Sequence, residues 1–356
     1  MKRSRMQRRF LLAILFFILL LANICAQPKF PGATWEKAAK PEDIGFSSAK
    51  LSAARQFTNS IKTAAVVIVV NGMILDEWGE VEKKFMTHSI RKSFLSAMYG
   101  KYVRSGLIDL DKSILELGID DNPPLSEEEK SATIRDCLKA RSGVYHPALY
   151  ESKGMKTLKP QRHTVRAGTH WYYNNWDFNV LGTIFEKLVH KKIFVALKED
   201  IADLIGMEQY RPEDGWYVTG DESRHAAYPF RITARDMARF GLLMLRKGNW
   251  NGKQIIDADW VKESTRYHSD ASLYGTDGYG YMWWVARHHN KFPHLPGVEL
   301  SEGSFSARGA GGHYILVIPV DDMVIVHRVN TDERGNSVSR ENFGRLVKMI
   351  LEAKES

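Results

Sequence analysis

The sequence is poor in cysteine, with only Cys25 and Cys137 among 356 residues. Cys25 falls in an N-terminal leader, so the remaining body has a single thiol and can form no intrachain disulfide. Cys137 lies in the apolar-periodic stretch 133–140, where a buried structural thiol is favoured over a nucleophile. The free energy that keeps this body folded must therefore come from its hydrophobic core.

Several motifs of well-known enzyme sites are also absent. The chain contains no Gly-x-Ser-x-Gly, no His-Glu-x-x-His, no Cys-x-x-Cys and no phosphate-binding glycine loop. His288, His289 and His294 are close together, but they fall in a polar stretch that we expect to be an exposed loop and not a metal site. We therefore expect the protein to use neither a metal nor a cofactor.

The excess of positive charge is confined mainly to the leader. The whole chain has 50 Lys and Arg against 42 Asp and Glu, a formal net charge of +8. Residues 1–26 contain five of the basic residues and no acidic one, so the body carries 45 against 42, or +3. Such a small excess, with no basic run, predicts that the body has no nucleic-acid partner.

The leader has the three parts of a secretory signal. A basic stretch at 2–9 precedes the apolar run 10–21, and Asn-Ile-Cys-Ala follows at 23–26. We predict cleavage after Ala26, with an uncleaved membrane anchor as the alternative, although 10–26 is slightly shorter than the ~20 residues of a spanning helix. Either way, the body is expected in the periplasm or outside the cell, and any membrane contact is through the leader alone.

The body has strand-like segments at both ends and a mainly helical block between them. Two strand-like runs flank Asn71-Gly72, a strong hairpin signal, and the first of them (64–70) is apolar throughout, which indicates burial on both faces. The other expected strands are 279–287, 304–308, 313–319 and 323–329, and the expected helices are 48–59, 90–104, 133–140, 178–188, 233–246 and 341–353.

This order predicts an α+β fold, because strands and helices do not alternate along the chain. An antiparallel sheet is built from N- and C-terminal strands and flanked by helices. We expect one domain over 27–356, with a sheet lobe at about 42–86 and 270–356 and a large inserted helical lobe at about 87–269. The cleft between the lobes is the expected place for a site.

One Ser-x-x-Lys tetrad stands at the start of a predicted helix. Ser89 and Lys92, three residues apart, lie within reach of one another on a helix, and a desolvated lysine amine can accept the serine proton. The apolar stripe of the helix begins at Ile90 and leaves both residues off it. Ser47 and Lys50 also satisfy the pattern, and capping of the helix remains the alternative role for either serine.

Other motifs follow in order, and together they resemble the serine β-lactamase and penicillin-binding-protein superfamily, in its class C β-lactamase-related branch. They are Ser89–Asp111, Thr133–Pro147, the Gly168–Gly182 segment with Tyr-x-Asn at 173–175, Ile232–Gly241, and the glycine-rich 309–312 that leads into a strand. The resemblance covers nearly all of the body.

The resemblance implies roles for individual residues. Ser89 would be the acylated nucleophile and Lys92 its base, with Tyr173 of the Tyr-x-Asn element as a proton shuttle. Beside a lysine ammonium, the phenolate form of this tyrosine is expected to be favoured. Asn175 would hold Lys92 and the substrate carbonyl, and Tyr172 is the neighbouring alternative to Tyr173.

The third element of the family departs from its usual pattern. Where the family has Lys-Thr-Gly or His-x-Gly, this chain has Ala310 followed by Gly311 and Gly312. The backbone N–H groups of His313 and Ser89 would bind the oxyanion. The cation that pairs with a β-lactam carboxylate is missing, unless the side chain of His313 or of Arg308 replaces it.

The sequence thus predicts an exported serine hydrolase that cleaves an ester, amide or peptide bond of a small molecule through an acyl-enzyme on Ser89. One alternative is a non-catalytic, peptide-binding protein of the cell envelope with the same fold. Another is a true β-lactamase or D-Ala-D-Ala peptidase.

Overall fold

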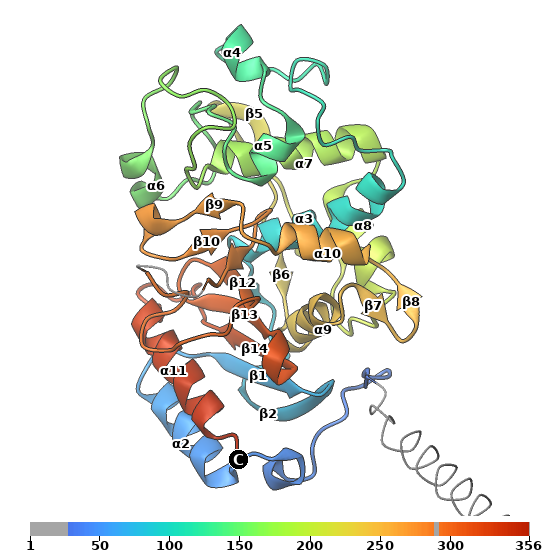
Figure 1. The fold of residues 1–356 in the computed structure, drawn as a ribbon, viewed down its shortest axis with the longest axis vertical. Helices are drawn as coiled ribbons and strands as arrows, with labels where there is room; N and C mark the ends of the chain where they lie inside the picture. The colour runs from blue at the N-terminus through green and yellow to red at the C-terminus, as the bar shows by residue number, and fades with distance from the viewer. Residues whose placement is uncertain (1–27, 288–291, 356) are drawn as a thin grey trace, which may run out of the picture.

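The computed structural model describes residues 28–287 and 292–355, and the predicted leader lies outside these ranges. An eight-stranded sheet forms the centre of the molecule (Figure 1), in the order β2-β1-β14-β13-β12-β11-β10-β9, with every neighbouring pair antiparallel. Its strands are β1 (Ala65–Val70), β2 (Met73–Gly79), β9 (Ser269–Asp270), β10 (Gly278–Tyr279), β11 (Trp284–Val285), β12 (Phe305–Gly309), β13 (His313–Ile318) and β14 (Met323–Arg328).

The predicted α+β fold is confirmed, since β1 from the N-terminal part pairs with β14 from the C-terminal part. Asn71 and Gly72 form the predicted turn between β1 and β2, both with positive φ (51° and 78°). The predicted strand 279–287 is instead two short strands, β10 and β11. A tight turn separates them, in which the N–H of Gly280 donates to the carbonyl of Trp283 at 2.8 Å.

Helices cover both faces of the sheet, and in the view of Figure 1 several of them lie above it together with loops and β5. They are α2 (Ser48–Asn59), α3 (Ile90–Arg104), α4 (Glu127–Lys130), α5 (Ile134–Leu138), α6 (Lys153–Leu158), α7 (Asn175–Val189), α8 (Ile193–Leu197), α9 (Ala234–Leu245), α10 (Ala258–Ser264) and α11 (Arg340–Glu352). The block between the sheet segments also contains three strand pairs that were not predicted: β3 (Phe85–Met86) with β6 (Arg231–Ile232), β4 (Val218–Gly220) with β5 (Ser223–Ala227), and β7 (Asn249–Trp250) with β8 (Lys253–Gln254).

The two faces of the sheet bury different cores. In β1, Val66 and Ile68 pack toward α2 and α11, whereas Val67 and Val69 pack toward α3 and α9. Burial on both faces explains why this strand is apolar at every position.

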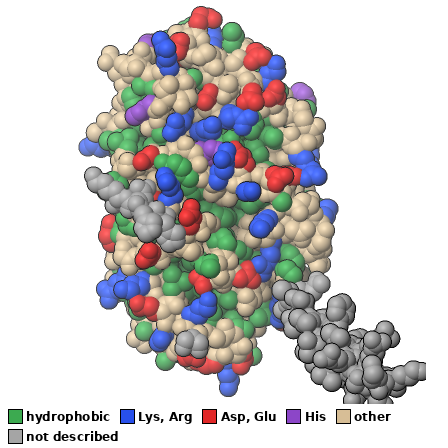
Figure 2. Space-filling view, in the orientation of Figure 1, with side chains coloured by type: hydrophobic (Ala, Val, Ile, Leu, Met, Phe, Trp, Pro, Cys, Tyr) green, Lys and Arg blue, Asp and Glu red, His purple; other side chains and the backbone are tan. Residues whose placement is uncertain are grey.

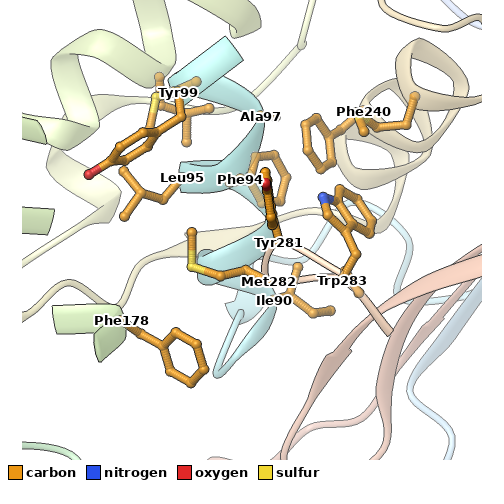
Figure 3. Packing of buried hydrophobic residues seen from close by; sticks show 14 of the residues in the cluster. Ile90, Phe94, Leu95, Ala97, Tyr99, Phe178, Phe240, Tyr281, Met282 and Trp283 are labelled. Atoms are coloured by element: carbon orange, nitrogen blue, oxygen red, sulfur yellow. The ribbon is translucent and has the colours of Figure 1, made fainter. Parts of the chain in front are cut away.

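Helix α3 is buried on nearly all sides, which the predicted apolar stripe did not indicate. Figure 3 shows Phe94 of α3 beside Phe240 of α9, with ring centroids 3.8 Å apart. Polar residues of the helix are buried as well, and two of them bind backbone groups of the 280–283 turn. Ser93 and Ser96 donate to the carbonyls of Met282 and Tyr281, both at 2.7 Å.

On the face shown in Figure 2, lysine, arginine and acidic side chains are interspersed, with no extended patch of one sign. Within the described ranges, no helix is both long and apolar enough to span a bilayer. Cys137 is a free, buried thiol, and burial raises its pKa well above the ordinary value, as expected for a structural cysteine.

The close contact of α9 with the sheet at Gly241 gives a test of this packing. A β-carbon on Gly241 would lie 2.5 Å from Val324 of β14 and 2.9 Å from Ile315 of β13. We expect Gly241→Ala to lower the free energy of unfolding by about 1–3 kcal/mol, because the helix or the strands must shift. Urea denaturation measures the change. Gly154→Ala in α6, where no neighbouring atom is closer than 4.0 Å, is the control and should not destabilise the protein. Equal stability of the two variants would contradict the packing described here.

Candidate active site

A cavity of about 690 Å³ opens where the start of α3 faces the tip of the β12–β13 hairpin. Of the predicted site residues, Ser89, Tyr173, Asn175, Gly311 and Gly312 line it. Lys92 lies directly beneath them, bonded to three of them.

Ser89 occupies the position that precedes the first residue of α3, but its side chain makes no capping hydrogen bond. Its hydroxyl oxygen instead lies 3.2 Å from Nζ of Lys92, close enough for its proton to pass to a neutral amine. The preceding residue, His88, has a left-handed backbone (φ 47°) and a pKa lowered to about 4 by burial and by nearby arginines. The alternative that Ser89 serves as a helix cap is therefore not what the structure shows, whereas Ser47 does cap α2.

Lys92 is the centre of the site, with only 1% of its surface exposed. Its amine donates to the hydroxyl of Tyr173 and to Oδ1 of Asn175, both at 2.8 Å, which leaves the lone pair of the neutral form for Ser89. Among the described residues, no carboxylate lies within ion-pair distance of this amine. Burial, followed by the charge of Arg91, lowers the pKa of Lys92 well below its usual 10.5. Burial therefore shifts Lys92 toward the neutral amine, the form that can accept a proton.

The predicted direction of the pKa shift of Tyr173 was wrong. Burial raises the pKa of this phenol to about 12, although a hydrogen bond with Ser89 and the charges of Arg91 and Arg308 oppose the shift. The expectation assumed a lysine ammonium next to the ring, but the desolvated Lys92 favours its neutral form. Tyr173 is therefore protonated at neutral pH.

Asn175, in the first turn of α7, hydrogen-bonds both Lys92 and the backbone at 149–150. Its Oδ1 accepts from Lys92, and its Nδ2 donates to the carbonyls of Tyr150 at 2.6 Å and Leu149 at 3.3 Å. The structure thus has the predicted contact with Lys92. Because both amide hydrogens already have acceptors, none remains for the predicted contact with a substrate carbonyl.

The hairpin tip approaches the nucleophile through Gly309, one residue before the predicted third element. A β-carbon at Gly309 would lie 2.7 Å from the carbonyl oxygen of Thr87 and 3.3 Å from Cβ of His88, so only glycine allows this contact. The N–H groups of Ser89 and of Ala310, the next residue, have no hydrogen-bond acceptor within the described part of the chain. Both residues line the cavity.

His313 is placed differently from the prediction. It is fully buried and does not line the cavity. Its Nδ1 accepts from Nε of Arg328 at 3.0 Å, and burial lowers its pKa well below the usual value. Position 313 is the first residue of β13, on the far side of the hairpin turn from Gly309. The side chain of His313 therefore cannot replace the missing cation, whereas Arg308 does line the cavity.

The expected exposed histidine loop is wrong for His294, which is only 3% exposed. Its Nδ1 lies 3.1 Å from Asp277 and its Nε2 lies 2.8 Å from Ser306. His288 and His289 lie outside the described residues. Within the described ranges, no group of three or more His, Cys, Asp or Glu side chains could hold a metal ion.

Among the cavity residues that were not predicted are Arg340 and Tyr150. Arg340, the first residue of α11, reaches the cavity from the C-terminal end of the chain, and no motif marks it. Tyr150 also lines the cavity and has a left-handed backbone (φ 66°), which its sequence neighbours do not reveal.

The fold and the Ser-Lys-Tyr-Asn arrangement define a serine hydrolase fold of the β-lactamase and transpeptidase type. A family model described as Beta-lactamase matches residues 49–347, so the chain belongs to the beta-lactamase family.

Solved structures of this type are similar in fold. A putative 6-aminohexanoate-dimer hydrolase from Bacillus anthracis has a TM-score of 0.64 and 23% identity, over 91% of this chain and 88% of that one. A class C beta-lactamase has a TM-score of 0.62 and 19% identity, over 86% and 95% of the two chains. An uncharacterized protein from Alkalihalophilus pseudofirmus is 24% identical over 302 residues, which cover 75% of this chain and 84% of the relative.

Burial of Lys92 makes folding stability depend on pH. Unfolding lets the amine take up a proton that the folded state disfavours. The free-energy cost of burying Lys92 therefore falls as the pH rises toward the ordinary lysine pKa of 10.5. We expect the free energy of unfolding of the wild type, relative to Lys92→Met, to rise from pH 6 to pH 9 by at most about 1.4 kcal/mol per pH unit. Denaturant titrations at several pH values measure this difference.

Lys101→Met, which removes a half-exposed lysine from the same helix, is the control and should keep the wild-type pH dependence. If Lys92→Met also keeps it, the amine is protonated in the folded protein.

Proposed function

We propose that the protein is a serine hydrolase that cleaves an ester or amide bond of a small molecule through an acyl-enzyme on Ser89. The observation that carries the proposal is the single amine of Lys92, which contacts Ser89, Tyr173 and Asn175 at 2.8–3.2 Å without a carboxylate partner. A neutral amine at hydrogen-bond distance from a hydroxyl is an activated nucleophile pair.

In acylation, Oγ of Ser89 attacks the substrate carbonyl carbon while its proton passes to Nζ of Lys92. Nζ then carries the positive charge in a site that disfavours it, so it readily returns a proton through the Tyr173 hydroxyl to the leaving group. Since Tyr173 stays protonated at neutral pH, it relays a proton in this step and does not serve as a standing phenolate base.

The negative charge that develops on the carbonyl oxygen is stabilised by two backbone donors. We assign them to the N–H groups of Ser89 and Ala310, in place of the predicted pair with His313, because Gly309 lies against Thr87 and His88. Each such donor is worth about 3 kcal/mol in the transition state. Water then attacks the carbonyl carbon of the acyl-enzyme and loses its proton to the same relay, which returns that proton to Oγ of Ser89 as the ester bond breaks.

The cell-envelope binding protein remains the alternative to an enzyme, and turnover decides between them. Purified protein is assayed with p-nitrophenyl butyrate, nitrocefin and a D-Ala-D-Ala peptide. We expect release of p-nitrophenol, with nitrocefin slow or unreacted. The proposal also places the enzyme outside the cytoplasm, because of the leader at 1–26.

Covalent labelling tests the nucleophile. We expect Ser89→Ala to abolish labelling by a fluorophosphonate probe, and Lys92→Met to lower ester turnover by about 10²–10⁴-fold, as for loss of an acid–base group. Ser47→Ala is the matched control, because Ser47 and Lys50 form the other Ser-x-x-Lys tetrad while Ser47 only caps α2. Intact-mass spectrometry detects the adduct. Undiminished labelling of Ser89→Ala would exclude Ser89 as the nucleophile.

A further inference from the structure

A buried histidine outside the cavity faces only hydrogen-bond acceptors. His146 lies in the segment 144–150 of the helical block and is fully buried. Its Nδ1 lies 2.9 Å from the carbonyl oxygen of Pro147, and its Nε2 lies 3.1 Å from that of Pro123. Because a carbonyl oxygen can only accept, each ring nitrogen needs a proton to form its hydrogen bond. Only the doubly protonated imidazolium forms both bonds.

A carboxylate beside this ring supplies the opposite charge. Oδ2 of Asp121 lies 3.4 Å from Nδ1 of His146, and both side chains are fully buried. The carboxylate also accepts four hydrogen bonds at 2.6–2.8 Å, from Trp176, Ser223 and two backbone N–H groups. Although burial opposes the shift, these bonds hold the pKa of Asp121 below its usual range. Asp121 is thus an anion that can compensate a buried imidazolium.

A second histidine and a lysine also lie near the ring. Nε2 of His225 lies 3.9 Å from Oδ2 of Asp121 without a hydrogen-bond partner in the described chain, and its Nδ1 lies 3.1 Å from the hydroxyl of Thr183. Burial lowers the pKa of His225; Asp121 opposes the shift and the charge of His146 adds to it. Nζ of Lys159 donates to the carbonyl of His146 at 3.0 Å and is itself paired with a carboxylate at 2.6 Å. Asp121 therefore remains to compensate one charge, and the hydrogen bonds identify it as that of His146.

The ring fixes a segment that reaches the active site. Residues 144–150 belong to no helix or strand. The ring of His146 ties the middle of this segment to the chain at 121–123. Three and four residues further on, the carbonyls of Leu149 and Tyr150 accept from Nδ2 of Asn175 at 3.3 and 2.6 Å. The place of these two carbonyls thus depends on the anchoring of the segment.

The orientation of the Asn175 amide decides whether Lys92 can act as a base. With Nδ2 bound to the two carbonyls, Oδ1 is turned toward Lys92 and accepts from Nζ at 2.8 Å. Rotation of the amide by half a turn would point its N–H groups at the same nitrogen. They would then bind the lone pair with which the neutral amine accepts the proton of Ser89. The carbonyls at 149 and 150 exclude this orientation as long as the segment keeps its place.

We propose that His146 is a buried imidazolium paired with Asp121, and that it acts as a positioning residue for Asn175 through the segment 144–150. The effect on catalysis rests on the hydrolase function proposed above, whereas the charge of the ring does not. His146 lies outside the lining of the cavity, so it acts on the reaction only through other residues.

Nitrogen NMR reads the charge of the ring directly. Spectra of 15N-histidine-labelled protein at about pH 7.5, where an ordinary histidine is mostly neutral, distinguish doubly protonated rings from neutral ones. We expect an imidazolium signal that is lost in His146→Gln and in Asp121→Asn and is kept in His225→Gln. A neutral signal for His146 overturns the proposal. If His146→Gln does not fold, the wild-type spectrum decides, because the absence of every imidazolium signal has the same consequence.

A double-mutant cycle separates positioning from a general loss of structure. We expect His146→Gln to lower kcat/KM for p-nitrophenyl butyrate about tenfold, but by less than about twofold when Asn175→Ala is already present. A merely structural role would give the same factor in both backgrounds, and that result would overturn the positioning role. Asp121→Asn, which keeps the ring and removes the opposite charge, replaces His146→Gln if that variant does not fold. His170→Gln, which removes an exposed histidine, is the control and should keep the wild-type kcat/KM.

If the wild type hydrolyses no ester, the proposed function fails, and the amide of Asn175 still reports its own position. Spectra of 15N-asparagine-labelled wild type, His146→Gln and His170→Gln are compared, and Asn175→Ala identifies the Nδ2 signal. We expect this signal to shift in His146→Gln and to stay in place in His170→Gln. An unchanged signal in His146→Gln rejects the positioning role.

Discussion

The site depends on one constraint, a lysine amine held almost entirely out of water without a carboxylate beside it. A buried amine must satisfy its hydrogen bonds, and Lys92 does so with a hydroxyl, a phenol and an amide oxygen. Each partner is neutral, so nothing compensates a positive charge there, and burial favours the amine as a base. A carboxylate in place of Asn175 would reverse this by stabilising the ammonium form. The choice of an amide at 175 is therefore as important to the chemistry as the lysine itself.

The fold makes such burial possible by placing α3 at the centre of the molecule. Its first turn meets the N-terminal end of α7, which supplies Asn175, and the hairpin tip at Gly309 closes the other side. Because α3 is packed by α9, α10 and the sheet, Lys92 cannot swing into solvent to regain hydration. The same packing explains the polar residues on the buried faces of the helix, since Ser93 and Ser96 satisfy carbonyls of the turn between β10 and β11.

Local sequence patterns predicted the elements well and tertiary contacts poorly. The bounds of the helix at 90–104 and the Asn71-Gly72 hairpin follow from local signals, and so does the pairing of Ser89 with Lys92 one turn apart. The sign of the Tyr173 pKa shift could not follow, because it depends on the burial of Lys92, which a sequence spacing does not report. The placement of His313 and Gly309 was missed for a related reason: a glycine-rich hairpin permits several registers, and only the approach to Thr87 fixes which residue faces Ser89. The burial of His294 depends on its contacts with Asp277 and Ser306. Both residues lie outside the local polar stretch from which an exposed loop was predicted.

Lys92 and Arg308 have different roles in this cavity because lysine and arginine differ in intrinsic basicity. Burial removes the charge from a lysine readily, since its ordinary pKa is only a few units above neutrality, and Lys92 becomes a proton acceptor. An arginine begins two units higher, so burial and the nearby Arg340 lower the pKa of Arg308 only to about 10, and it stays charged at neutral pH. A site that needs a neutral base and a fixed positive charge within one cavity is thus served by lysine for the first and arginine for the second. Because Arg308 keeps its charge, it does not compete with Lys92 for the role of base.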